Sequence, residues 1–427
     1  MESFDGTRPI GGRSATLEPF QVIAKPAGAI CNLGCEYCFY LSKESLYPGG
    51  RFRMSEGVLD AYLRQMIRSH NGRKVAIAYQ GGEPTLMGLD FFRRAVALAE
   101  RYRQPGQQIE HVLQTNGTLL TKEWCRFLKS HDFLVGLSVD GPRDLHDAFR
   151  RDKRGGPTFT KVMRGMRHLQ DSGVRFNILC TVNAANADSP VEVYRFFRDS
   201  CGACFIQFIP IVEKRLLAAD CSHGEQSVRS VTPGKWGQFL IAVFDEWLHG
   251  DVGRVFVQMF ETALASWMGM PPTMCVFAEV CGRGVALEHN GDVYSCDHFV
   301  DCDHLLGNVG AIDLADLVSS PSQRSFGEAK RRALPRCCLI CDVRFACNGE
   351  CPKNRFARTQ DGETGLNYLC AGYKAFFHHI DAPMRLMAAL VNSGRQAREI
   401  MALFASAQRN EPCPCGSGQK AKRCHGR

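Results

Sequence analysis

Short apolar runs alternate with amphipathic stretches from about residue 20 to residue 250. Six of the runs have the length and composition of buried strands, at residues 20–24, 74–79, 110–114, 133–139, 174–181 and 205–211. Stretches with apolar residues three and four positions apart predict helices near residues 55–67, 89–103, 121–131, 158–171, 190–200 and 233–248. Each predicted strand is therefore followed by a predicted helix.

Six strand–helix units predict an α/β fold with parallel strands and right-handed crossovers. They are too few for a closed eight-stranded barrel, so a partial barrel or an open doubly wound sheet is expected. In either arrangement, functional side chains lie at the carboxyl ends of the strands.

The pattern changes after about residue 270, where the strand–helix alternation stops and Asn-Gly and Gly-Asp turns appear. Such a segment buries little apolar surface of its own, so we expect bound metal to hold it together. A helical pattern rich in Ala, Leu and Met returns from about residue 381 to residue 408, before a short basic tail.

The formal net charge of +8 is modest for 427 residues, and the basic residues are spread out, with small groups at 150–154 and 331–336. Proteins that bind nucleic acid usually concentrate this charge on one face, so we predict no nucleic-acid partner. An acidic protein partner would still fit.

The sequence shows no secretion signal and no apolar stretch long enough to cross a bilayer. We expect a soluble, cytoplasmic protein with no membrane partner.

Cysteine is unusually abundant, with 21 residues. Without an export signal, this number favours metal ligation or catalysis over disulfides. The distribution supports the same interpretation, because sixteen cysteines fall in four groups, at residues 31–38, 275–302, 337–370 and 413–424. The remaining five are isolated: Cys125, Cys180, Cys201, Cys204 and Cys221.

The first group, Cys31, Cys35 and Cys38, forms a C-x3-C-x2-C motif directly after the first predicted strand. Three thiolates on one loop can hold three irons of a 4Fe–4S cube and leave the fourth iron open. An open iron is what a bidentate ligand such as S-adenosylmethionine requires. Zinc normally takes four ligands and rarely has this spacing, so a zinc site is the weaker alternative.

A second motif, Gln80-Gly-Gly-Glu-Pro84, follows the second predicted strand. Gly81 and Gly82 leave the backbone open there, and Glu83 offers an acceptor for an ammonium group. With the cysteine motif, this sequence resembles the radical S-adenosylmethionine superfamily over about residues 20–250. The resemblance implies a partial (β/α)6 TIM-type barrel and reductive cleavage of S-adenosylmethionine to a 5′-deoxyadenosyl radical.

The same resemblance implies which residues contact the cofactor. They are Tyr37, Gly82, Ser138, Arg150 and Val212, with Arg150 as a partner for the cofactor's carboxylate. Two of these residues have simpler interpretations: Arg150 could be a surface arginine, and Val212 could be a core residue.

Eight further cysteines are enough to ligate two more 4Fe–4S clusters completely. They are Cys275, Cys281, Cys296, Cys338, Cys341, Cys347, Cys351 and Cys370. Their spacing resembles the SPASM extension of peptide-modifying radical enzymes. The resemblance implies that Cys351 joins Cys275, Cys281 and Cys296 on the first auxiliary cluster, and that the other four hold the second. Structural zinc for part of this set remains an alternative, and Cys302 and Cys337 are left over.

Within this class, the sequence resembles anaerobic sulfatase-maturating enzymes over about residues 18–390. The supporting segments are Asp140-Gly-Pro142, Leu145-His-Asp147 with Arg150, Gln207-Phe-Ile-Pro210, Tyr294-Ser-Cys-Asp-His298, Asn308-Val-Gly310 and Asn348-Gly-Glu-Cys-Pro352. The resemblance implies oxidation of a cysteine or serine in a Cys/Ser-x-Pro-x-Arg region of a sulfatase to Cα-formylglycine. It also implies an electron donor such as flavodoxin or ferredoxin, and makes Asp297 the general base that takes the side-chain proton. A turn residue is the alternative for Asp297.

Two other functions remain open. A related SPASM enzyme could instead mature a ribosomally made peptide through a thioether or carbon–carbon crosslink. Many such enzymes carry an amino-terminal precursor-binding domain, whereas about 18 residues precede the first predicted strand here. A non-catalytic iron–sulfur or zinc scaffold is the third possibility, but a scaffold has no need of an open iron.

The tail has the ligand pattern C-x-C-x8-C-H, formed by Cys413, Cys415, Cys424 and His425. These four donors suit tetrahedral zinc. The pattern resembles the SEC-C motif, which implies a zinc ion and a partner in protein export or on the ribosome. We therefore expect a radical SAM partial barrel at residues 18–250, a SPASM domain at 251–390, and a helical linker with a SEC-C motif at 391–427.

Overall fold

The computed structural model describes residues 19–70, 72, 74–213, 228–416 and 418–423. Its centre is a ten-stranded sheet in the order β10-β9-β8-β1-β2-β3-β4-β5-β6-β7. The strands are β1 (Gln21–Ala24), β2 (Lys74–Tyr79), β3 (Gln108–Thr115), β4 (Leu134–Ser138), β5 (Phe176–Val182), β6 (Phe205–Pro210), β7 (Phe256–Val257), β8 (Gly284–Leu287), β9 (Asp292–Tyr294) and β10 (Leu305–Asn308). All six predicted strands are confirmed, and β1 to β7 are parallel.

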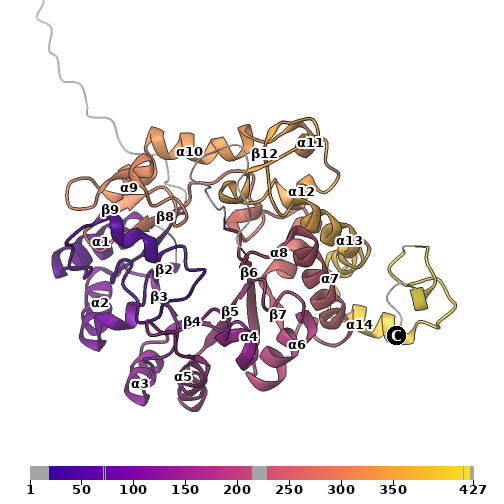
Figure 1. The fold of residues 1–427 in the computed structure, drawn as a ribbon, viewed down its shortest axis with the longest axis horizontal. Coiled ribbons are helices and arrows are strands. Elements are labelled where there is room, and N and C mark those ends of the chain that lie inside the picture. The colour runs from indigo at the N-terminus through magenta and orange to yellow at the C-terminus, as the bar shows by residue number, and fades with distance from the viewer. Residues whose placement is uncertain (1–18, 71, 73, 214–227, 417, 424–427) are drawn as a thin grey trace, which may run out of the picture.

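Helices cover the outer side of this sheet, which curves into a partial barrel (Figure 1). They are α1 (Glu56–Ser69), α2 (Leu89–Tyr102), α3 (Lys122–Ser130), α4 (Arg143–Asp147), α5 (Phe159–Asp171), α6 (Pro190–Arg195) and α7 (Pro233–Gly250). The predicted cap of the first helix is confirmed, because the Ser55 hydroxyl accepts a hydrogen bond of 3.2 Å from the Val58 amide.

The second part of the chain continues the same sheet. Strand β8 pairs in parallel with β1, with Ala24 opposite Leu287, and β9 and β10 follow in antiparallel order. Around these strands lie α8 (Gln258–Trp267), α9 (Leu314–Val318), α10 (Pro321–Arg332), α11 (Arg336–Leu339), α12 (Arg344–Cys347) and the small hairpin of β11 (Ala357–Arg358) and β12 (Thr364–Leu366). The segment expected to be loop-rich and metal-held is therefore also tied to the barrel by backbone hydrogen bonds.

The helix expected from about residue 381 begins earlier. Helix α13 spans Cys370–Asn392 with Pro383 inside it, and α14 (Glu399–Ser406) follows. Helix α13 crosses α7 at two glycines, where a Cβ on Gly237 would lie 2.8 Å from the Cα of Gly372. This contact lets the two backbones approach closely and fixes Cys370, the first residue of α13, against the barrel.

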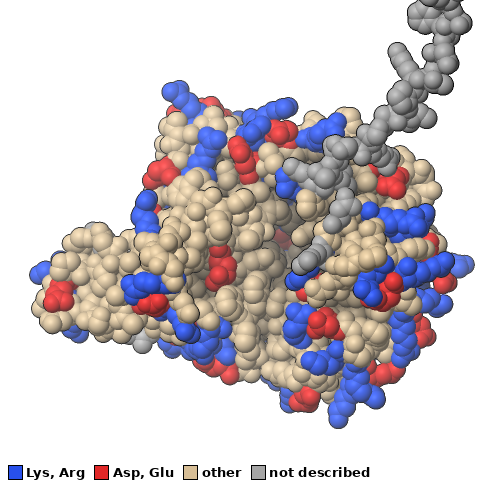
Figure 2. Space-filling view, turned by 180° about the vertical axis from the view of Figure 1, so that it is seen from behind, with Lys and Arg blue, Asp and Glu red and all other residues tan. Residues whose placement is uncertain are grey.

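One face of the molecule is hollowed near its centre, and acidic and basic side chains are interspersed over the surrounding surface (Figure 2). The mixture agrees with a solvated surface rather than a single basic stripe. Within the described residues, no helix combines the length and hydropathy that crossing a membrane requires.

His111, on β3, gives the fold a pH dependence. Its buried ring stacks on Phe133 at 4.8 Å between centroids, and burial lowers the pKa of His111 to about 4. In the unfolded chain the His111 imidazole therefore becomes protonated near pH 6.5, whereas in the folded chain it becomes protonated only near pH 4. We predict that His111 makes the thermal unfolding midpoint fall as the pH drops through this window, and that His111→Phe makes the fall shallower.

The control is His168→Gln, because His168 lies on another element, helix α5, and is only half-buried. It should leave the slope of the unfolding midpoint against pH unchanged. Equal slopes for His111→Phe and the unsubstituted protein would contradict the assignment.

Candidate functional site

The first cysteine motif lies in the loop after β1, at the carboxyl ends of the parallel strands. The loop is held by the segment after α4, since the Gly34 amide donates to the Arg151 carbonyl at 2.9 Å and the Glu36 amide to the Phe149 carbonyl at 3.1 Å. Burial, with smaller contributions from nearby Cys35 and Cys38, raises the pKa of Cys31 to about 12. The three thiols are thus close together, and burial also raises the pKa of Cys35, to about 11. Bound iron would supply the positive charge that favours thiolates, so this donor set fits an iron–sulfur cluster.

Amide groups surround the sulfur of Cys31. The Leu33 amide donates to it at 3.3 Å, and the Asn116 side chain approaches it at 3.7 Å. Asn116 also donates to Asn32 at 2.9 Å, and Asn32 donates to Thr118 at 2.8 Å. This network connects the cysteine loop to the end of β3 and would orient the Cys31 thiolate towards a cluster.

The Gly81-Gly82-Glu83 segment runs beside the cysteine loop. Its backbone donates from Gly82 to Gly28 at 2.8 Å and from Glu83 to Ile30 at 2.9 Å. A Cβ on Gly82 would lie 2.0 Å from the Ile30 carbonyl oxygen, so only glycine fits there. The sequence motif thus has a structural cause, which is the close approach of two backbones.

Glu83 has a different set of contacts from the expected one. Its buried carboxylate accepts hydrogen bonds from the Thr85 amide and hydroxyl at 3.0 and 2.5 Å, from Thr115 at 2.7 Å and from the Asn116 amide at 2.8 Å. These four donors join the ends of β2 and β3 and occupy both carboxylate oxygens. The expected contact of Glu83 with an ammonium group stays a prediction.

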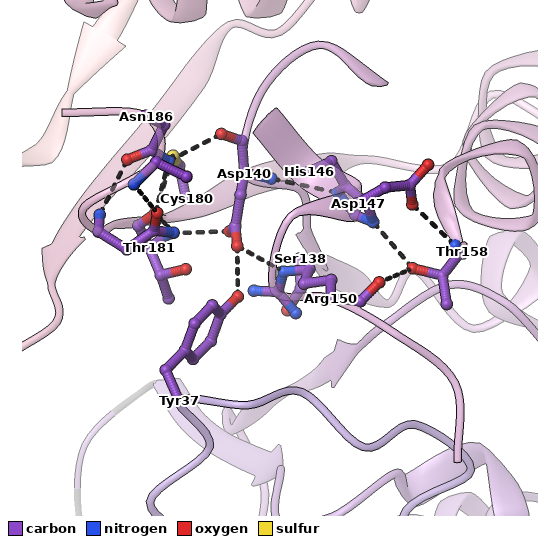
Figure 3. Close-up of polar contacts among 12 residues, drawn as sticks. Tyr37, Ser138, Asp140, His146, Asp147, Arg150, Thr158, Cys180, Thr181 and Asn186 are labelled. Carbon is purple, nitrogen blue, oxygen red and sulfur yellow. Dashed lines mark hydrogen bonds and ion pairs between the residues drawn. The ribbon is translucent and has the colours of Figure 1, made fainter. Parts of the chain in front are cut away.

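Tyr37 and Arg150, two of the expected cofactor contacts, meet on the carboxylate of Asp140 (Figure 3). The Tyr37 hydroxyl donates to Oδ2 of Asp140, and Nε of Arg150 lies 3.0 Å from the same oxygen. The Thr181 amide donates to Oδ1 at 3.0 Å. All three side chains are buried. Within the described residues, the two terminal nitrogens of Arg150 make no hydrogen bond, so they remain available to an anion.

The other two expected contacts lie at neighbouring strand ends. Ser138 ends β4, where its hydroxyl accepts a hydrogen bond of 2.9 Å from Gln114. Val212 follows β6 and is buried. Both are therefore at the carboxyl edge of the sheet, as predicted from the order of strands.

Asp297 lies between β9 and β10 and forms an ion pair with Lys25, the residue after β1. The two side chains are 13% and 1% exposed, respectively. Burial opposes the charge on Asp297, but the Lys25 ammonium outweighs burial and holds the pKa of Asp297 below its ordinary value. The Lys25 ammonium also lies 4.2 Å above the ring of Tyr40. The site therefore holds an ionised carboxylate directly beside Cys296.

Four of the remaining cysteines gather next to Asp297. Burial, with smaller contributions from Cys275 and Cys281, raises the pKa of Cys296 to about 12, and Cys351 interacts with both Cys296 and Cys281. The buried Lys330 donates to the carbonyls of Cys275 and Val276 at 2.9 and 2.8 Å. The structure thus brings together the set expected for the first auxiliary cluster and places an ammonium group beside it.

The other four cysteines share one cavity. Cys338, Cys341, Cys347 and Cys370 line it together with Arg344, Tyr373 and Lys374. Burial raises the pKa of Cys338 and of Cys347 to about 12. Glu350 and Arg355 lie between the two sets, because both interact with cysteines of each. The eight cysteines therefore lie in two groups of four, and their ligation of two clusters stays a prediction.

The tail can be assessed only in part. Cys413 and Cys415 are buried, and the chain folds back there, with the Cys413 amide donating to the Gln419 carbonyl at 2.7 Å. Cys424 and His425 lie outside the described residues. The zinc site stays a prediction.

Sequence reasoning missed the partners of the expected residues, namely Lys25, Asp140 and Lys330. Lys25 had a visible signal, because it is a charged residue directly after a buried strand. Asp140 was noticed only as part of a motif, since nothing local indicates that Tyr37 and Arg150 converge on it. Lys330 follows the helical pattern of α10 and gives no sign that its side chain is buried.

Three family models match the chain. They are the radical SAM superfamily at residues 26–197, an iron–sulfur cluster-binding domain at residues 275–342 and the SEC-C motif at residues 409–427. The first two cover the cysteine loop after β1 and part of the two cysteine sets.

Curated relatives match over almost their whole length. A serine-type anaerobic sulfatase-maturating enzyme of Bacteroides thetaiotaomicron is 44% identical over 380 residues, which are 87% of this chain and 91% of that protein. A cysteine-type anaerobic sulfatase-maturating enzyme of Clostridium perfringens is 32% identical over 85% of this chain and 96% of that protein. The solved structure of native anSMEcpe with bound AdoMet and Cp18Cys peptide is 31% identical, with a TM-score of 0.77 over 87% of this chain and 99% of that one.

The contacts of Asp140 predict a large stability effect. Asp140→Ala would leave the buried Arg150 guanidinium without its ion-pair partner, which typically costs about 3–5 kcal/mol. Asp90→Ala is the matched control, because the Asp90–Arg93 pair is exposed to solvent, where an ion pair contributes little to stability. Denaturant unfolding of both variants measures the difference, and equal losses would contradict the role of Asp140.

Proposed function

The chain belongs to the anaerobic sulfatase-maturating enzymes of the radical SAM superfamily, and we propose that its substrate residue is a serine of a sulfatase polypeptide. It is an enzyme that oxidises a sulfatase cysteine or serine to Cα-formylglycine by 5′-deoxyadenosyl radical chemistry. The observation that best supports this function is the Asp297 carboxylate, which Lys25 holds ionised beside Cys296.

Serine is supported by the degree of similarity to the two kinds of relative. Identity is 44% to the serine-type enzyme and 32% to the cysteine-type enzyme, over similar lengths. A serine hydroxyl is also a weaker acid than a cysteine thiol, so its oxidation depends more on a positioned base. The buried Asp297–Lys25 pair supplies such a base at a fixed place.

The cofactor would be held at the carboxyl ends of β1 to β6. Cys31, Cys35 and Cys38 would bind the iron–sulfur cluster that activates S-adenosylmethionine. When bound, the cluster and S-adenosylmethionine together would supply the radical that removes a hydrogen atom from Cβ of the target. The terminal nitrogens of Arg150 would bind the cofactor's carboxylate, because Asp140 already fixes the Nε side of the guanidinium. Tyr37, Gly81, Gly82, Ser138 and Val212 would form the surrounding wall, and Glu83 would brace two of its loops.

Asp297 would act after hydrogen abstraction. Its carboxylate would take the proton of the target hydroxyl, and the remaining electron would leave towards the adjacent cysteine set. Lys25 keeps the carboxylate ionised while the substrate arrives and fixes its position. Residues Cys275, Cys281, Cys296 and Cys351 would hold the first auxiliary cluster and Cys338, Cys341, Cys347 and Cys370 the second.

The tail would bind zinc through Cys413, Cys415, Cys424 and His425. The support is the SEC-C match at residues 409–427 and the burial of the two described cysteines. A zinc-bound tail would give the enzyme a second surface for a partner in protein export or on the ribosome. Flavodoxin or ferredoxin would serve as the electron donor for cofactor cleavage.

The substrate proposal is tested with two peptides that differ in one residue. Anaerobically reconstituted enzyme, dithionite and S-adenosylmethionine are incubated with a short sulfatase peptide carrying Ser-x-Pro-x-Arg, or with its Cys-x-Pro-x-Arg counterpart. We expect the serine peptide to lose the mass of two hydrogen atoms, in step with 5′-deoxyadenosine. Faster conversion of the cysteine peptide would overturn the serine proposal, and conversion of neither would overturn the proposed function.

The role of Asp297 is tested by Asp297→Asn. Removing a general base typically slows its step about 10²- to 10⁴-fold, so formylglycine should fall by that factor. Formation of 5′-deoxyadenosine should persist, because Asp297 is not among the residues that would bind the cofactor. If both products fell together while the iron content stayed normal, Asp297 would belong to cofactor binding instead.

A further inference from the structure

Exposed apolar side chains are concentrated beside the second cysteine set. Leu339, Ile340 and Phe345 are 49%, 78% and 47% exposed, and they lie on α11, on α12 and on the loop between them. Among the described residues, they are three of ten large apolar side chains with such exposure. We call these three residues the α11–α12 patch. A group of exposed apolar residues within one short hairpin is typical of an interaction surface.

The patch is carried on a fixed support. Phe345 packs against Trp267 of α8 with 4.8 Å between ring centroids, and Val343 and Ala346 beneath the hairpin are buried. The Arg344 side chain donates to the Leu339 carbonyl at 3.4 Å, which ties α12 back to α11. The patch is therefore presented by a braced hairpin rather than by a loose loop.

The same hairpin carries three of the four cysteines that line the second cavity. Cys338 directly precedes Leu339, Cys341 follows Ile340, and Cys347 comes two residues after Phe345. A protein seated on the patch would consequently lie against the wall of this cavity. The first cysteine set lies beside Asp297, and Glu350 and Arg355 stand between it and the second.

The charge around the patch is positive. The basic side chains beside it are Arg336, Arg344 and Lys374, which are exposed or half-buried. Two acidic side chains lie near them, and both have partners: Asp342 is paired with His378 at 2.8 Å, and Glu363 accepts a hydrogen bond of 2.8 Å from the Arg336 amide. Arg344 and Lys374 line the cavity itself, and Arg336 is exposed on α11. A partner that covers the patch would therefore need an acidic surface around an apolar centre.

We propose that the α11–α12 patch is the docking site of a small acidic one-electron carrier protein of the flavodoxin or ferredoxin kind. The inference rests on the proposed function, because formation of formylglycine removes one hydrogen atom, one proton and one further electron from the substrate side chain. The hydrogen atom goes to the deoxyadenosyl group and the proton to Asp297. The further electron requires an acceptor, and an oxidised carrier docked at this patch would become reduced by it.

Binding is measured directly, with the full-length reconstituted enzyme and two probes, one purified flavodoxin and one purified ferredoxin. At least one should bind, with an affinity that weakens as the salt concentration rises. Ile340→Glu should weaken binding at least about tenfold, because it places a like charge in the apolar centre. Arg336→Glu should weaken binding severalfold and flatten the salt dependence.

Two matched controls lie elsewhere on the surface. Ile312→Glu changes an apolar side chain that is 44% exposed, and Arg126→Glu reverses an exposed charge on α3. Helix α3 lies at the edge of the molecule opposite α11 (Figure 1). Both controls should keep the affinity within about twofold of the unsubstituted enzyme. Equal weakening by patch and control variants, or binding of neither probe, would overturn the docking site.

Peptide conversion with dithionite separates this proposal from the proposed function. Ile340→Glu and Arg336→Glu should bind as much iron as the unsubstituted enzyme and convert the peptide with dithionite at the same rate, because neither residue lines the cysteine cavity. Loss of carrier binding with unchanged conversion supports the docking site. An unsubstituted enzyme that binds a carrier but converts neither sulfatase peptide would refute the function and leave the carrier surface in place.

Discussion

The site depends on the buried ion pair between Lys25 and Asp297. A buried ammonium and a buried carboxylate each require the other, because neither can be left unpaired away from water without a large cost. Lys25 follows the first strand of the barrel, whereas Asp297 lies 272 positions later, beside a cysteine of the first auxiliary set. The pair therefore joins the barrel that carries the first cysteine motif to the part of the chain that carries the other two cysteine sets. Strand β1 supports this join, since it pairs with β2 on one side and β8 on the other.

Buried thiols give the two auxiliary sets their electrostatic character. Burial raises the pKa values of Cys275, Cys281, Cys296 and Cys351 in the first set and of Cys338, Cys347 and Cys370 in the second, although Lys330 and Arg355 lie close by. Metal must therefore deprotonate the thiols as it binds, which couples cluster assembly to folding of this region. Arg355 contributes to the backbone as well, because it donates to the carbonyls of Gly349, Asn348 and Glu350 at 2.8 to 2.9 Å. The Arg355 side chain thus both places a positive charge near the cysteines and holds the backbone around residues 348–350 in position.

Sequence patterns predicted the barrel well because its strands and helices are locally encoded. The apolar run at 74–79 and the periodic helix after Ser55 need no distant information, and spacing alone drew attention to Cys31, Cys35 and Cys38. Pairing of β8 with β1 and convergence of Tyr37 and Arg150 on Asp140 were not predictable in this way. These contacts join residues far apart in the chain, and periodicity contains no signal for them. The start of α13 was not predicted, because Gly372 and the aromatic residues in its first turns have low helix propensity.

The crossing of α7 and α13 at Gly237 and Gly372 bears on how the enzyme can be divided. The backbones of the two helices touch only because both residues at the crossing are glycines. Helix α13 also begins with a cysteine of the second set. A barrel taken from one relative and a cluster-bearing segment taken from another would have to reproduce both glycines to seat that cysteine. The two parts are therefore poor candidates for independent expression or for exchange between enzymes. They are better regarded as one folding unit, whose core also includes Cys413 and Cys415 of the tail.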